Sequence, residues 1–152
     1  MNREILFRGK RVSDNEWMYG SLILDKKFRD VSKEIPYIRE RGLNEATSYY
    51  YGGAGLEVIP ETIGKYSGLT DKNGTKIFEG DIHHHYDTHS KKDRWYIVCY
   101  GEFHDTVYNF DGYGWYFAEI NGDDTESFEG NEQDYVNIVG NIYDNHELLG
   151  GW

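Results

Sequence analysis

The sequence predicts a mainly β protein with little helix. Tryptophan, tyrosine and phenylalanine make up 16% of its 152 residues, and aromatic side chains suit the half-buried, pleated surface of a sheet. Its 18 glycines separate short apolar runs, and many short strands between such turns favour a barrel or a sandwich. The chain has the length of one ordinary domain, which can bury a core without disulfides or metal.

In the first half, short runs of apolar and aromatic residues predict strands. They lie at residues 3–8, 16–24, 57–59 and 63–66. Residues 25–56 begin with a stretch of mixed charge and predict an irregular excursion, with a short strand near 35–38.

The clearest local signal is Asn73-Gly74 between two strand-like runs. Both residues tolerate positive φ, so the pair predicts a tight hairpin turn. A second turn is expected at 79–81 and others at Gly101 and Asp111-Gly112. The predicted strands are 82–86, 95–100, 103–110, 113–120 and 136–143. Residues 121–134 predict a polar, acidic loop.

At the C-terminal end, one short helical turn is expected over residues 145–149. Asp144 has the side chain of a good N-cap, and Gly150 is typical of the residue that ends a helix. The sequence contains no comparable pattern for a longer helix. Helix therefore contributes little to the expected fold.

Segments at both ends and in the middle of the chain resemble the YopX family of small proteins, encoded mainly by phages and prophages of Gram-positive bacteria. They are 3–10 (REILFRGK), 16–20 (EWMYG), 60–82 (PETIGKYSGLTDKNGTKIFEGDI) and 139–145 (VGNIYDN). The resemblance implies a single domain over 1–152, with an N-terminal β region at 1–60. It also implies an SH3-like small barrel, built largely from the C-terminal half, with its core at 61–149. It implies no activity and carries over no catalytic residue.

Charge is distributed unevenly along the chain, whose formal net charge is −11. Residues 95–152 contain twelve carboxylates and no lysine or arginine. Such a surface repels phosphate, which argues against direct nucleic-acid binding and suits a basic partner. No run is long enough to span a membrane and no signal-peptide pattern opens the chain, so a cytoplasmic protein is expected, in the host cytoplasm if phage-encoded.

A run of histidines is the one cluster that suggests metal. His83, His84 and His85 are followed by His89, and Asp81 precedes them. On a strand, His83 and His85 share a face and could bind Zn²⁺ or Ni²⁺ with a carboxylate. The spacing matches no established metal motif, and a polar, partly exposed strand explains it better. We therefore expect no catalytic residue, no cofactor-binding residue and no metal ligand.

Aromatic runs suggest an interface. Neighbouring residues in 49–51 and 110–117 cannot all face one core, so some rings are expected at the surface. The leading hypothesis is a non-catalytic module that binds a protein partner or itself as a homo-oligomer. One alternative is an acidic inhibitor that mimics nucleic acid and binds a DNA-binding protein. The other is a metal-dependent enzyme that uses His83 and His85 with Asp81.

Overall fold

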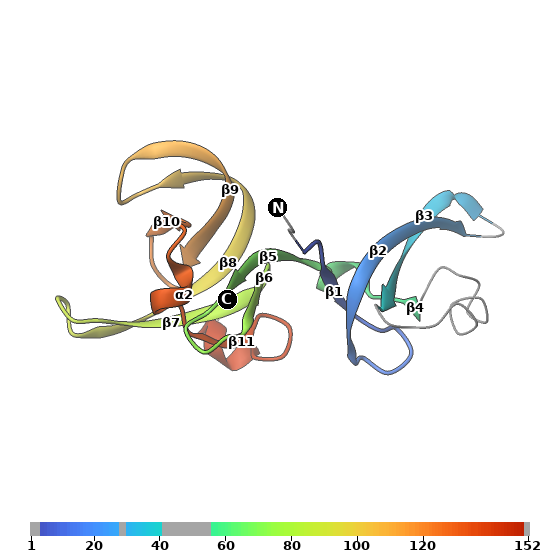
Figure 1. Cartoon of the computed structure of the whole chain (residues 1–152), viewed down its shortest axis with the longest axis horizontal. Helices are drawn as coiled ribbons and strands as arrows, with labels where there is room; N and C mark the ends of the chain where they lie inside the picture. Colours follow the sequence, from blue (N-terminus) through green and yellow to red (C-terminus); the bar gives the residue numbers. More distant parts are fainter. Residues whose placement is uncertain (1–3, 28–29, 41–55, 151–152) are drawn as a thin grey trace. The chain divides into compact units, whose positions relative to one another are not determined.

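The computed structural model describes residues 4–27, 30–40 and 56–150, and the side chains of 27, 30 and 31 are also left out (Figure 1). In this part of the chain, eleven strands accompany a four-residue α-helix and two short 3-10 helices. The mainly β fold with little helix is confirmed. No helix among the described residues is long and apolar enough to cross a membrane. The tyrosine run at 49–51 lies outside the described residues.

The chain divides into two compact units, Met1–Tyr66 and Ser67–Trp152. The strands of the first unit follow the order β4-β3-β2-β1-β5. Their bounds are β1 Phe7–Lys10, β2 Trp17–Lys27, β3 Asp30–Glu40, β4 Leu56–Glu57 and β5 Gly64–Thr70, with the 3-10 helix η1 at Pro60–Thr62. β5 begins in this unit and ends in the second.

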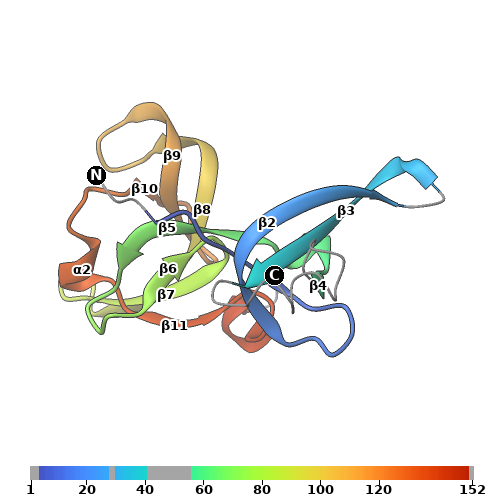
Figure 2. The ribbon, with the colours of Figure 1, turned by 45° about the vertical axis from the view of Figure 1, so that its right-hand side comes forward.

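The first unit is built on the antiparallel β2–β3 hairpin, which forms a long twisted ribbon (Figure 2). Its core consists of Met18, Ile38 and Val58, all at most 3% exposed. The expected short strand near 35–38 is therefore part of an eleven-residue strand, β3. The prediction of an irregular segment is wrong for residues 25–27, which belong to β2, and for residues 30–40. Ile35 to Ile38 pair with β2, and this pairing positions Ile38 in the core.

The second unit contains a five-stranded antiparallel sheet of order β10-β9-β8-β7-β11 and the short β5–β6 hairpin. Its elements are β6 Lys76–Phe78, β7 Asp81–Asp87, β8 Lys92–Asp105, β9 Phe110–Glu119, β10 Thr125–Ser127, α2 Glu132–Tyr135, β11 Ile138–Asn141 and η2 His146–Leu149. β10 and β11 form the two edges, so within the described residues this sheet does not close into a barrel.

The sheet of the second unit is buried on both faces around β8. Tyr96 and Val98 pack on one side with Ile77, Phe117 and Val136. Their neighbour along the strand, Ile97, packs on the other side in a cluster that also contains Ile82, Ile120 and Leu149. Because successive side chains of a strand alternate in direction, one central strand supplies two cores.

The two turns expected at Asn73-Gly74 and at residues 79–81 are confirmed. Gly74 has φ 83° in the turn between β5 and β6, and Gly80 has φ 90° in the turn before β7. Asp71 organises the first turn, since its Oδ1 accepts hydrogen bonds from the backbone N–H groups of Asn73 and Thr75 at 2.9 and 2.8 Å. Its Oδ2 accepts a third from Ile138 N–H at 3.0 Å, which ties the turn to β11.

Three local expectations are wrong. Gly101 and Asp111-Gly112 are not turns, because they lie inside β8 and β9 and the reversal occurs at residues 106–109. The acidic stretch 121–134 is not all loop, since it contains β10 and the start of α2. Asp144 does not cap the last helical turn: the N-cap is Asn145, while Asp144 accepts a hydrogen bond from Asn141. The predicted end of the helical turn at Gly150, which has φ 60°, is confirmed.

Candidate functional site

The histidine run lies on β7, and its members have different surroundings. His83 is 3% exposed and packs against Tyr96 and Phe117, with ring centroids 5.8 and 5.2 Å away. His85 shares its face, at 6.3 Å between ring centroids, but is exposed. His84 points to the other face, where its ring lies 4.4 Å from Trp95.

One ring nitrogen of His83 is already engaged in a hydrogen bond. Its Nδ1 lies 2.9 Å from the backbone N–H of Asn137, which donates to it. Burial lowers the pKa of His83 to about 4, although the carbonyl oxygen of Asn137, 3.3 Å from Nδ1, opposes the change. His83 is therefore neutral at pH 7 and acts as a packed ring whose Nδ1 accepts a backbone hydrogen bond.

The carboxylate proposed to join the histidines is also occupied, since Asp81 is buried and its Oδ2 accepts a hydrogen bond from Phe78 N–H at 2.8 Å. Asp87 accepts hydrogen bonds from Ser90 and from the backbone of His89. Across the described ranges, no three His, Cys, Asp or Glu side chains converge as a metal site would require. The metal-dependent alternative therefore gains no support from the geometry.

Arg94 neutralises much of the acidic charge at the start of β8. Its guanidinium forms ion pairs with Asp87 at 3.2 Å, Glu119 at 3.2 Å and Asp124 at 2.9 Å. These carboxylates come from β7, from the end of β9 and from the following loop, so the arginine joins segments distant in sequence.

Two carboxylates of β9, Asp111 and Glu119, could be considered as a general acid and base. They lie at opposite ends of the strand, which leaves them too far apart to work as an acid–base pair.

Asp105 fixes the tip of the β8–β9 hairpin. Its carboxylate accepts backbone hydrogen bonds from Val107 at 2.9 Å, Tyr108 at 2.7 Å and Ser127 at 2.8 Å. Burial opposes ionisation, yet these N–H groups together hold the pKa of Asp105 below its ordinary value. The tip is thus tied to β10 by an ionised, buried side chain, which limits its freedom to move.

The hairpin itself is a long, curled ribbon (Figure 1) with ten consecutive cross-strand pairs. At its midpoint Gly101 pairs with Gly114, and their φ angles are 147° and 149°. Residues other than glycine rarely adopt these angles. The glycine pair therefore lets both strands bend together while the hydrogen-bonded register continues.

Replacing Gly101 with alanine should lower the free energy of unfolding by about 1–2 kcal/mol, because alanine is strained at this φ although open space surrounds the position. Urea unfolding would measure the loss, with Glu102→Ala on the adjacent residue as a control expected within about 0.5 kcal/mol of wild type. A more stable Gly101→Ala variant would instead indicate an ordinary strand conformation.

Beyond the glycine pair, one face of the hairpin carries rings and carboxylates at the surface. Tyr113 is 71% exposed, and its ring lies 5.7 Å from that of Tyr100, which is 39% exposed. Glu102 lies directly opposite Tyr113, and Asp111 is two residues before it on β9. Tyr108, in the turn at the end of the ribbon, is 64% exposed, and its hydroxyl makes a hydrogen bond with Glu129. We use the name hairpin face for the exposed surface of this ribbon that consists of Tyr100, Glu102, Tyr108, Asp111 and Tyr113.

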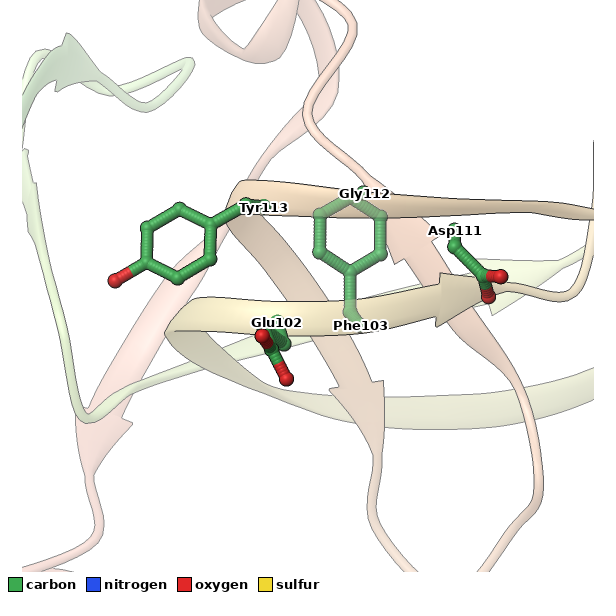
Figure 3. A pocket seen from close by; sticks show the side chains of 5 residues that line it. All are labelled: Glu102, Phe103, Asp111, Gly112 and Tyr113. Atoms are coloured by element: carbon green, nitrogen blue, oxygen red, sulfur yellow. The ribbon is translucent and has the colours of Figure 1, made fainter.

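An open hollow of about 640 Å³ lies at the hairpin face. Its lining comes from two strands, Glu102 and Phe103 of β8 and Asp111, Gly112 and Tyr113 of β9 (Figure 3). Phe103 fills the space beside Gly112, where an added Cβ would lie 2.6 Å from its ring. The hollow therefore combines two exposed carboxylates with aromatic surface.

The sequence predicted exposed rings within 110–117 but missed Tyr100 and Glu102 as part of the same surface. The signal was present as a two-residue alternation, in which Tyr100 and Glu102 on β8 face Trp115 and Tyr113 on β9. Assigning Gly101 to a turn concealed it, because a turn would break the alternation at that residue.

A family model described as YopX protein matches residues 6–150, which extend from the residue before β1 to the residue after η2. No curated protein matches the chain. Among solved structures, the chain is similar to the protein of "Crystal structure of protein EF1440 from Enterococcus faecalis". The two are 17% identical with a TM-score of 0.48, and the match covers 97% of this chain and 99% of that chain.

Proposed function

The chain belongs to the YopX family, and we propose that it is a non-catalytic protein-binding module that contacts its partner through the hairpin face. The observation that carries the proposal is the exposure of Tyr113 and Tyr108, 71% and 64%, on a hairpin held by its own hydrogen bonds. Tyrosine gives a large contact area with few rotatable bonds, and protein interfaces are enriched in it.

Rigidity of the hairpin supports this function. Asp105 ties the turn to β10, and Thr106 exchanges further hydrogen bonds with Thr125, whose N–H donates to its Oγ1 at 3.0 Å. A backbone that is already held in place loses little freedom when a partner binds, which favours affinity. A surface of this kind is suited to recognising a second protein.

The contacts that the carboxylates make within the fold favour this proposal over mimicry of nucleic acid. Glu119 and Asp124 are paired with Arg94, and Asp105 accepts hydrogen bonds from the backbone. Glu132 is fully buried and accepts hydrogen bonds from the backbone N–H groups of Glu129 and Gly130. These carboxylates serve the fold, whereas an imitation of phosphates would need them at the surface in a regular row.

Partner capture and photo-crosslinking test the proposal together. A photo-reactive benzoylphenylalanine replaces Tyr113 in one preparation and Tyr86 in a control, since Tyr86 is 51% exposed on β7 outside the hairpin face. Position 113 should crosslink to one defined polypeptide from an extract of the cell that encodes the chain, and position 86 should not. Mass spectrometry then identifies the partner, including a second copy of the chain.

The matched variants are Tyr108→Ala/Tyr113→Ala and Tyr86→Ala. We expect the double variant to retain the crosslinked polypeptide roughly tenfold less well in a capture assay, because exposed aromatic anchors dominate interface energies. Tyr86→Ala should capture it as wild type does, and both variants should keep wild-type melting temperatures within a few degrees. Equal capture by the double variant would show that the hairpin face is not the contact surface.

A further inference from the structure

The hollow of the hairpin face contains an unusual combination of groups. Glu102 is exposed and, among the described residues, its side chain makes no hydrogen bond or ion pair. Its cross-strand neighbour Tyr113 is 71% exposed. Asp111 adds a second carboxylate at the other end of the hollow, beyond Phe103 (Figure 3). Residues 95–152 contain no lysine or arginine that could neutralise these two carboxylates.

We propose that the hollow binds an arginine side chain of the partner protein, with its guanidinium against the Tyr113 ring and paired with Glu102, while Asp111 adds negative charge at the far end of the hollow. This deepens the proposed function and rests on it. The proposal stands on charge complementarity: the lining offers carboxylates, aromatic surface and no cationic side chain.

Arginine fits these groups better than lysine does. Its guanidinium is flat, so it can stack on a tyrosine ring while its N–H groups at the edge donate to a carboxylate. A lysine ammonium is compact and more strongly hydrated, and it cannot make both contacts in the same plane. The hollow offers one exposed ring, Tyr113, with Glu102 directly opposite it on the neighbouring strand, and a planar cation suits this combination.

Glu102 is the main anchor within the pair. Asp111 already lies 2.8 Å from the Nδ1 atom of His104, its cross-strand neighbour, and therefore has a competing contact. Glu102 has none in the described part of the chain. Removing the charge of Glu102 should weaken arginine binding more than removing that of Asp111.

N-acetylarginine amide is the probe, and binding is followed by backbone amide NMR of the full-length chain. We expect saturable shifts confined to residues near the hollow, with a dissociation constant on the order of millimolar, as for one small contact. N-acetylcitrulline amide has the same shape without the charge and should give no saturable shift. N-acetyllysine amide should bind several-fold more weakly than the arginine probe.

Glu102→Gln should weaken the arginine probe roughly tenfold, because a charge-assisted contact is replaced by a neutral one of the same size. The matched control is Asp123→Asn, which makes the same change of net charge at an exposed residue outside the hollow. This control should bind as wild type does.

Equal binding of the citrulline probe, an unchanged affinity for Glu102→Gln, or the absence of saturable shifts would each overturn the inference. Equal affinity for the lysine probe would overturn the assignment to arginine. If the arginine probe fails while crosslinking through position 113 succeeds, the binding module stands and this inference alone falls. If crosslinking fails as well, both are wrong.

Discussion

Replacing Asp71 with alanine should lower the free energy of unfolding by about 3–5 kcal/mol, which is enough to unfold many domains of this size. Asp71 is 2% exposed and accepts hydrogen bonds from Asn73, Thr75 and Ile138. Alanine leaves these N–H groups without their acceptor. A buried donor without a partner costs about 1–3 kcal/mol, and water can compensate in part near the exposed turn.

Urea unfolding followed by circular dichroism would measure the effect of Asp71→Ala. Asp71→Asn retains one acceptor oxygen and should lose less, while Lys72→Ala, at the exposed neighbouring position, should stay within about 0.5 kcal/mol of wild type. Hydrogen exchange at the Ile138 amide should accelerate in Asp71→Ala, because its contact ties the β5–β6 turn to β11. A loss below about 1 kcal/mol would show that water replaces the carboxylate at little cost.

The local part of the fold could be predicted from the sequence. Asn73-Gly74 specifies its turn through backbone conformation alone, and Gly150 ends the last helical turn for the same reason. The partner of Asp71 could not be predicted, since Ile138 lies 67 residues further along the chain. Contacts at that distance depend on how the strands assemble, which a pattern in one segment does not encode.

The candidate site was predicted in part, for a comparable reason. Exposed rings in 110–117 follow from alternation along one strand, and Tyr113 confirms this. Glu102 becomes a neighbour of Tyr113 only through the register of β8 with β9. That register passes through the pair Gly101 and Gly114, and Gly101 looks like a turn residue when β8 is considered alone.

A histidine buried without charge makes stability depend on pH. The pKa of His83 is lowered from 6.5 to about 4, chiefly by burial and further by the nearby charges of His85, His84 and Lys72. In the unfolded chain His83 takes up a proton near its ordinary pKa. The unfolded state therefore binds more protons than the folded state between these two values, and the folded state loses stability as the pH falls through them.

The expected loss of stability follows from the pKa of His83 in the unfolded chain and in the folded chain. At pH 7 the histidine is neutral in both states and its contribution is fully present; by pH 4 the chain should have lost about 3 kcal/mol from this residue. His104 acts in the opposite direction, because its hydrogen bond with Asp111 raises its pKa. That contribution is present at low pH and is lost as the pH rises through the raised value, so it offsets part of the slope.

His83→Asn separates the two histidines. The Asn Oδ1 atom can accept the Asn137 N–H as Nδ1 does, while the side chain does not titrate. The variant should be less stable than wild type at pH 7, because it fills less of the space beside Tyr96 and Phe117. Its disadvantage should shrink steadily between about pH 6.5 and pH 4, as measured by urea unfolding at each pH. A constant difference across that range would contradict a buried, neutral His83 and would reopen the metal-binding alternative, since an accessible imidazole titrates near its ordinary pKa.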